Sequence, residues 1–184
     1  TFALLFALIV AAPAGAQTVN ENVIREAQIV HNRVQKYKDI SRKLTKYNIM
    51  VDGFFMFGFD NEDNTIFQST LTAVKEMDLD DAIAYILTPY PGTESFRKLD
   101  REKRILNYNW TKYSWYNCNY QPVKMTPQEL EDGLRWLYRE LNKHYRQTFL
   151  RRVWKYRALA IRHLPLTMKI IQNYWNWVDV TKLP

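Results

Sequence analysis

Two stretches of mostly apolar residues decide the fold of this chain. Ile49 to Asp63 reads IMVDGFFMFGFDNED, and Ala82 to Thr93 reads AIAYILTPYPGT. Their apolar parts, Ile49 to Phe57 and Ala82 to Leu87, have the length of strands. Such nearly continuous hydrophobicity is typical of strands buried on both faces of a parallel sheet. We therefore predict two buried, parallel strands.

The segment between the two runs has the period of a helix. Residues suited to one helix face recur at steps of three or four, namely Ile66, Phe67, Thr70, Leu71, Val74 and Met77. A strand, a helix and a strand within about 40 residues form a βαβ unit. Ligands of such sheets bind where the strands end at their carboxyl edge. Here we expect a ligand near Gly58 to Asn61 and Thr88 to Thr93.

Composition limits the kinds of site that the chain can hold. The 184 residues are enough for one domain with a real core. The single cysteine, Cys118, excludes an internal disulfide and a metal site made only of cysteines within this chain. The three histidines lie far apart in the sequence. We therefore predict no metal-ligating residue, and we interpret Cys118 as a passive thiol.

Positive charge is concentrated towards the end of the chain. The net charge is +7, and Leu141 to Val178 contain eight Lys and Arg residues but no acid. Within residues 143–178 these cations alternate with Trp and Tyr, a pattern that suits a membrane surface. It equally suits a solvated helix face or docking onto another part of a larger protein.

The first residues leave the location of the protein open. Residues 1–17 read TFALLFALIVAAPAGAQ, which fits a signal peptide or the start of a truncated internal segment. The expected location is the cytoplasm, with membrane association and secretion left open.

Three further helices are expected from capping and periodicity. Asn20 to Tyr47 place apolar residues on one face, including Ile40, Leu44 and Tyr47. Thr93 is a predicted N-cap. Thr126, Pro127 and Glu129 form a capping box, followed by a stripe of Leu130, Leu134, Leu137, Tyr138, Leu141 and Tyr145.

Two features at the strand ends have competing interpretations. Asp60 or Asn61 can cap the helix after the first strand, with Glu62 and Asp63 in its first turn. Tyr108 to Val123 interleave aromatic residues with Asn. These rings either stack on a ligand or a base, or anchor an irregular segment in the core.

The strand motifs resemble the C-terminal half of a radical S-adenosylmethionine (radical SAM) enzyme, in the branch that usually carries a cobalamin-binding domain. The resemblance covers roughly Asn20 to Arg152. YNIMVDGFFMFGFD is similar to the fifth barrel strand of that family, and ILTPYPGT to the sixth strand and its loop. Met125 to Glu140 resemble the helical extension of the branch. The resemblance implies that S-adenosylmethionine is bound by Phe55, Phe57, Gly58, Asp60, Leu87, Thr88, Pro89, Tyr90, Pro91 and Gly92.

One departure from the family changes the functional expectation. The Cys-x-x-x-Cys-x-x-Cys loop that holds the family's 4Fe–4S cluster is absent from this chain. A complete eight-stranded barrel also takes ~250 residues. We therefore expect an α/β fold: a partial (β/α) barrel over residues 18–104 and a mostly α-helical extension over 105–184, with the missing N-terminal part of the barrel as its partner.

The resemblance implies S-adenosylmethionine, a 4Fe–4S cluster and, in the named branch, cobalamin as cofactors of the full-length parent. We expect none of them to bind stably to this chain alone, which would be inactive and contributes no catalytic residue. The parent would cleave S-adenosylmethionine for a methylation or a cyclisation. The alternative is a non-catalytic secreted or membrane-surface binding module that uses the basic C-terminal helices. No nucleic-acid partner is expected.

Overall fold

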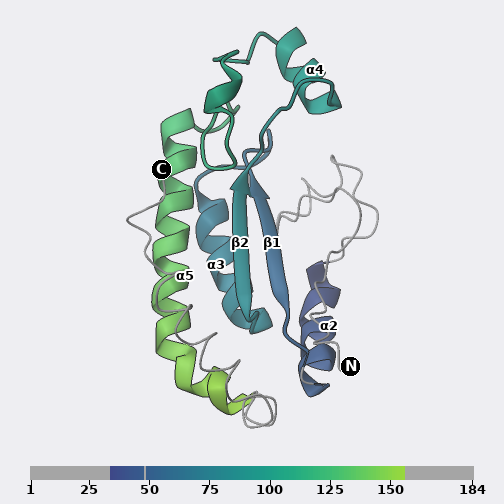
Figure 1. Ribbon diagram of the computed structural model, residues 1–184, viewed down its shortest axis with the longest axis vertical. Coiled ribbons are helices and arrows are strands. Elements are labelled where there is room, and N and C mark those ends of the chain that lie inside the picture. The colour runs from purple at the N-terminus through teal and green to yellow at the C-terminus, as the bar shows by residue number, and fades with distance from the viewer. Residues whose placement is uncertain (1–33, 48, 156–184) are drawn as a thin grey trace.

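The computed structural model describes residues 34–47 and 49–155. Residues 1–17, and the expected helix before Val34, lie outside this part. The described chain is built from α2 (Val34–Lys46), β1 (Asp52–Phe57), α3 (Thr65–Met77), β2 (Asp81–Ile86), α4 (Glu94–Arg101), the 3-10 helix η1 (Trp110–Lys112) and α5 (Pro127–Lys155) (Figure 1).

The predicted βαβ unit is confirmed. Strands β1 and β2 pair in parallel, in a register that runs from Asp52 opposite Asp81 to Phe57 opposite Ile86. Helix α3 connects them. Strand β1 is shorter than the predicted run, because Ile49 to Val51 lead into it without pairing to β2, and β2 begins and ends one residue earlier than predicted. The fold is therefore α/β, and the described strands form a two-stranded sheet rather than a closed barrel.

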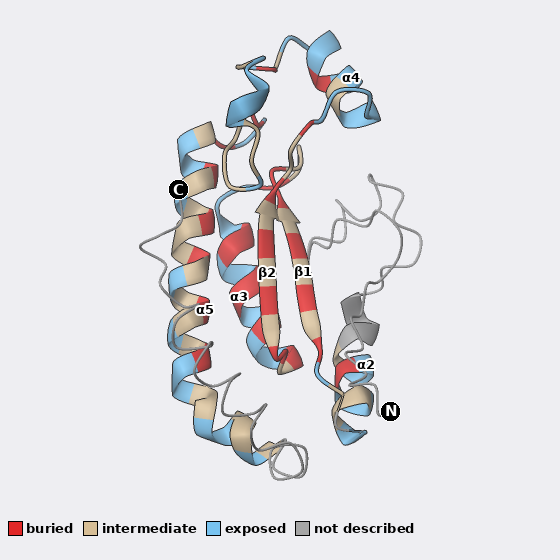
Figure 2. Ribbon diagram, viewed as in Figure 1, coloured by how far each residue is buried: buried red, intermediate tan, exposed pale blue. Residues whose placement is uncertain are grey.

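The expectation that both faces of the strands are buried is wrong. Burial alternates along each strand, because successive side chains point to opposite faces. The buried positions form what we call the covered face: Gly53, Phe55, Phe57, Ala82, Ala84 and Ile86 (Figure 2). The half-exposed positions form the open face: Asp52, Phe54, Met56, Asp81, Ile83 and Tyr85.

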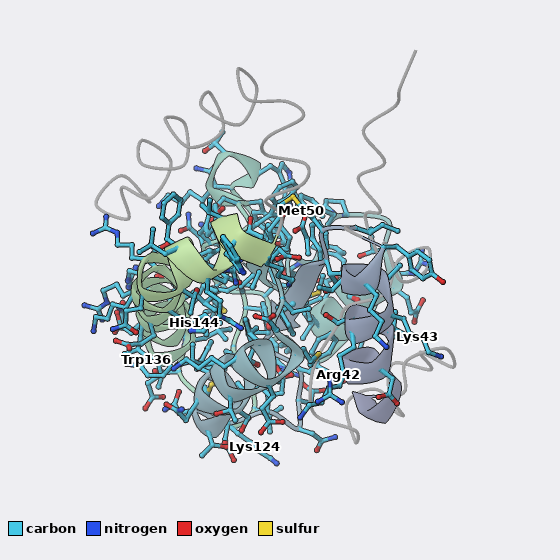
Figure 3. The ribbon with its side chains drawn as sticks, turned by 90° about the horizontal axis from the view of Figure 1, so that it is seen from below. Arg42, Lys43, Met50, Lys124, Trp136 and His144 are labelled. Atoms are coloured by element: carbon cyan, nitrogen blue, oxygen red, sulfur yellow. The ribbon has the colours of Figure 1, made fainter. Side chains whose placement is uncertain are left out.

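Within residues 49–155, helices cover one side of the sheet and leave the other uncovered. The ring of Phe57 lies 4.9 Å from that of Phe67 on α3, and α5 packs against both α3 and β2. Viewed along the long axis, α5, α3 and α2 follow one another around the strands, and Met50 lies on the side away from α3 (Figure 3). This one-sided helix layer is the reason for the alternating burial.

The outer edge of β2 is closed. Its outward-pointing N–H groups donate to the Asp81 carboxylate from Ala82, to the Tyr138 hydroxyl from Ala84, and to the Trp115 carbonyl from Ile86. The Tyr138 hydroxyl also donates to the Ala84 carbonyl at 2.8 Å. No further strand can pair along this edge without displacing these partners.

The outer edge of β1 is different. In a parallel ladder the backbone groups of alternate residues point to opposite sides. Phe57 bonds to β2 through its carbonyl, which accepts from Leu87 N, so the backbone groups of Asp52, Phe54 and Met56 point away from β2. Among the described residues, no hydrogen-bond partner of these outward groups is found. We call this side the open edge.

Helix α5 begins as the capping box predicts. The Thr126 hydroxyl accepts from Glu129 N, and the Glu129 carboxylate accepts from Thr126 N at 2.7 Å. Its predicted apolar stripe is confirmed, since every member is buried except Tyr138, which is half-buried. The helix also continues through the basic region that follows Phe149, as far as Lys155.

The apolar stripe predicted for α2 is only partly correct. Ile40 and Tyr47 are exposed, whereas Ser41 is buried and donates to the carbonyl of Met77 at the end of α3. A small hydroxyl residue allows α2 to approach α3 closely at this point. Hydrophobic period alone therefore misplaced the contact face of α2.

The basic end of α5 is tied to the acidic turn between α3 and β2. Arg151 and Lys155 pair with Asp78, and Lys155 also reaches Asp80 at 3.2 Å. Arg152 donates to the carbonyls of Leu79 and Asp80. Part of the positive charge at the C-terminal end thus stabilises the fold itself.

Candidate functional site

The carboxyl end of β1 is shaped by a buried carboxylate. Glu62 is fully buried and accepts hydrogen bonds from Gly58 N at 2.8 Å and Phe59 N at 3.1 Å. The sequence predicts Glu62 in the first turn of the next helix, but that helix begins only at Thr65. The carboxylate instead holds the turn that follows the strand.

Gly58 lies where only a glycine fits. Its φ angle is 102°, a left-handed conformation that side chains rarely adopt. A Cβ atom here would overlap the hydroxyl of Tyr120 and lie 2.9 Å from Leu130. The buried Tyr120 hydroxyl donates to the Gly58 carbonyl at 2.6 Å, so close packing of the C-terminal segment fixes this predicted site residue.

Asp60 does not cap α3, so that prediction is wrong. Its carboxylate pairs with Lys98 Nζ at 2.6 Å and with Arg104 at 2.7 Å. Burial acts to raise the pKa of Asp60, but the hydrogen bonds from Arg104 and Lys98 outweigh it and bring the pKa below its usual value. Asp60 thus links the end of β1 to α4 and the turn after it.

The loop after β2 is partly fastened and partly exposed. The Thr88 hydroxyl donates to the carbonyls of Ile86 and Ser114, and Pro89 is buried. Tyr90, Pro91 and Gly92 are exposed. Thr93 caps α4 as predicted, accepting from Phe96 N at 3.2 Å.

The sheet separates the predicted cofactor residues into two groups. Phe55 and Phe57 lie on the covered face, where their rings pack under the helices. Gly58, Asp60 and the loop from Leu87 to Gly92 gather at the carboxyl ends of the strands. A ligand role for these residues stays a prediction, and for Phe55 and Phe57 it could involve only their backbone.

Five aromatic rings form a cluster beyond the strand ends. We call it the aromatic platform: Tyr90, Phe96, Tyr108, Trp110 and Tyr113. Successive ring centroids lie 4.8 to 6.5 Å apart. Tyr90, Tyr108 and Trp110 are 43%, 56% and 48% exposed. The interpretation that rings of Tyr108 to Val123 anchor the segment in the core is therefore correct for the buried Tyr120 but wrong for Tyr108 and Trp110.

Two carboxylates face each other on the open face. Asp52 and Asp81 are opposite one another in the strand register. Burial, followed by repulsion from Asp81 and Asp80, raises the pKa of Asp52 to about 6. Burial also raises the pKa of Asp81. In the described part of the chain, no group of three metal-ligating side chains is found.

Several curated proteins are similar to this chain. The bacteriochlorophyllide d C-12(1)-methyltransferase of Chlorobaculum tepidum is 29% identical over 129 residues, which cover 70% of this chain and 28% of that protein. An uncharacterized methyltransferase of Pyrococcus horikoshii is 28% identical over 104 residues, covering 56% of this chain and 23% of the relative.

A third relative has a different named product. The tRNA-2-methylthio-N(6)-dimethylallyladenosine synthase of Vibrio campbellii is 33% identical over 79 residues, covering 42% of this chain and 16% of that protein. The chain is related to radical SAM proteins. The resemblance found in the strand motifs is thereby confirmed. The chain spans less than a third of the length of each of these relatives, and no family model matches it.

The chain's own residues do not fit the iron–sulfur cluster of a radical SAM protein. Such a cluster is held by several thiolates, and Cys118 is the single cysteine. Burial raises the pKa of its thiol to about 11, and the thiol donates to the Tyr120 carbonyl. Cys118 is therefore a protonated structural thiol, in agreement with its interpretation as passive.

The sequence did not single out the residues of the open face. Both strands are apolar on both faces, so hydrophobicity does not show which face is open. One signal in the sequence could have shown the open face. Counting every second residue along each strand, Asp52 falls on the same face as Phe54 and Met56, and Asp81 falls on the same face as Ile83 and Tyr85. A charged residue at a strand start marks the face that the helices do not cover.

A membrane contact through residues 143–178 stays a prediction. In the described part of the chain, no helix combines the length and the apolarity needed to cross a bilayer. Trp154 is 69% exposed, but the cations beside it, Arg151, Arg152 and Lys155, are occupied by the acidic turn. Residues 156–178 lie outside the described chain.

Proposed function

We propose that this chain is the C-terminal part of a radical SAM enzyme and forms one wall of its S-adenosylmethionine pocket. The observation that carries this proposal is the difference between the two sheet edges. Tyr138 and Trp115 close the edge of β2, and the edge of β1 has no described partner. The remaining strands of the barrel would pair with β1, and β2 would be the last strand.

The open face then becomes the inner wall of the barrel. It offers apolar side chains from two neighbouring strands, namely Phe54, Met56, Ile83 and Tyr85. Such a surface suits the adenine ring of a nucleoside, because a flat ring buries well against apolar side chains. The turns at Gly58 and Thr88 would bring backbone groups to the same carboxyl edge, where ligands of parallel sheets bind.

The role of this chain is binding and orientation rather than bond cleavage. The iron–sulfur cluster would be held by thiolates outside these 184 residues, and it would supply the electron that cleaves S-adenosylmethionine. Cobalamin, where the parent uses it, would likewise be held elsewhere. The chain alone is therefore expected to be inactive.

We further propose that the parent methylates a tetrapyrrole. The support is the similarity to the bacteriochlorophyllide d C-12(1)-methyltransferase. A match of 129 residues in a chain of 184 includes residues 56–129, wherever it begins. It therefore extends over both strand ends and the aromatic platform, whereas a match of 79 residues with the tRNA-modifying relative need not.

The binding proposal can be tested on the complete polypeptide that contains this chain. Met56→Glu places a charge on the open face, and we expect it to weaken S-adenosylmethionine binding at least about tenfold in calorimetry. Ser69→Glu on the exposed side of α3 is the matched control and should bind normally. Equal affinity of both variants would contradict the proposal, as would an upstream reading frame that lacks Cys-x-x-x-Cys-x-x-Cys.

A further inference from the structure

We propose that the aromatic platform holds the flat conjugated ring of the substrate, a tetrapyrrole, by stacking it on Trp110 and Tyr108. This inference rests on the proposed function and adds to it the surface that recognises the substrate. The platform is built from the loop after β2, the start of α4, and the segment around η1. It lies beyond the carboxyl ends of both strands (Figure 1).

The platform is held rigid before any ligand arrives. Trp110 contacts Tyr113 at 4.8 Å, Phe96 at 5.9 Å and Tyr108 at 6.3 Å between ring centroids. The Tyr108 hydroxyl donates to Asp100 at 2.6 Å, and the Tyr113 hydroxyl donates to the Asn107 carbonyl at 2.7 Å. Rings fixed in this way lose little conformational entropy when a flat ligand stacks on them.

Two rings of the platform remain largely exposed. About half of the surface of Trp110 and of Tyr108 is exposed to water. An irregular segment of this kind could instead have buried these rings in the core. Leu99 and Ile105, from the same region, are buried. The segment from Tyr108 to Val123 anchors itself in the core through Tyr120, which is fully buried, and it leaves the rings of Tyr108 and Trp110 outside.

The charges around the platform favour a flat ring over a nucleic acid. Nucleic-acid binding needs cations that are free to neutralise phosphates. Here Lys98 and Arg104 pair with Asp60, and Arg97 and Arg101 pair with Glu94.

Lys112 beside the platform is exposed, and no carboxylate among the described residues pairs with it. Lys103, in the turn after α4, is likewise exposed and unpaired among the described residues. A free cation beside several exposed rings suits a large flat ring that carries a carboxylate.

The test uses the complete polypeptide and chlorin e6, a soluble planar tetrapyrrole that carries carboxylates. Binding is followed by the shift of the chlorin absorption band. Trp110→Ala should raise Kd about tenfold, as expected for the loss of one stacking ring, and Trp110→Phe should restore most of the affinity. Trp154→Ala removes a Trp that is even more exposed, at the far end of α5, and should leave Kd unchanged.

Other outcomes would overturn the inference. Equal loss of affinity in Trp110→Ala and Trp154→Ala would mean non-specific adsorption of the chlorin. A lower melting temperature of Trp110→Ala with unchanged Kd would mean that the platform packs against another part of the protein. Trp110-dependent binding of a tRNA anticodon-arm hairpin, without chlorin binding, would assign the rings to RNA.

A separate measurement distinguishes this inference from the proposed function. S-adenosylmethionine affinity should be the same in Trp110→Ala and in the unmodified protein, because Trp110 itself lies outside the proposed cofactor wall. If S-adenosylmethionine binds but chlorin e6 does not, the platform inference fails and the proposed function stands. If S-adenosylmethionine does not bind at all, the proposed function itself fails.

Discussion

The two faces and the two edges of this small sheet differ in how far other parts of the described chain cover them. The covered face is packed under α3 and α5, and the edge of β2 next to it is closed by Tyr138 and Trp115. The open face shows half-exposed apolar side chains and two facing carboxylates, and the edge of β1 has no described partner. The difference teaches that, in the described part of the chain, the packing of the core comes from the helix-covered side, while the other side is left open to further contacts.

Large-to-small substitutions should show the largest contrast between the two faces. Phe57 is fully buried on the covered face, so Phe57→Ala should cost about 3–5 kcal/mol of unfolding free energy through the cavity it leaves. Its neighbour Met56 lies half-exposed on the open face, so Met56→Ala should cost less than about 1 kcal/mol. Urea unfolding measures both, and similar losses would mean that the open face is covered within this chain.

Removing the hydroxyl oxygen of Tyr138, which closes the edge of β2, should lower the free energy of unfolding. Tyr138→Phe leaves both backbone groups of Ala84 without their partner, so we expect a loss of about 1–3 kcal/mol. Tyr90→Phe is the control, because the exposed Tyr90 hydroxyl bonds to none of the described residues.

Hydrogen exchange gives a local reading of the same edge. The amide of Ala84 should exchange faster in Tyr138→Phe than in the unmodified protein. Unchanged protection would show that something other than Tyr138 closes the edge of β2.

The smallest expected effect comes from Asp52. Unlike the substitutions above, which lower the free energy of unfolding, replacing this carboxylate should raise it at high pH. A pKa raised from 3.8 to about 6 means that the folded state holds the proton more tightly than the unfolded state. Stability therefore falls as pH rises through this window. Asp52→Asn should remove that fall and stabilise the protein at pH 8, by about 1 kcal/mol because solvent screens this partly exposed group.

Asp60 should change stability with pH in the opposite direction to Asp52. Its pKa is lowered by Arg104 and Lys98 in spite of burial, so its contribution is present at neutral pH and is lost as pH falls. Asp60→Asn should therefore destabilise the protein at pH 8. If thermal unfolding shows Asp52→Asn to be destabilising as well, the two carboxylates of the open face have a cationic partner in the folded chain.

Local signals in the sequence predicted individual elements well. The period of Ile66 to Met77 gave α3, and the Thr126 capping box gave the start of α5. Both succeed because helix period and capping act between residues that are near in sequence. The prediction that Asp60 caps a helix failed because its partners, Lys98 and Arg104, lie some forty residues away.

The amino-acid sequence by itself determined the βαβ unit, the long C-terminal helix and the relationship to radical SAM proteins, because these depend on residue order and local spacing. Only the tertiary structure decided which face of the strands is open, which edge is closed, and that the rings of Tyr108 and Trp110 stay outside the core. Those outcomes depend on where α3, α5 and the segment around Trp115 come to lie. That arrangement is set by contacts between residues far apart in the chain, which no short pattern encodes.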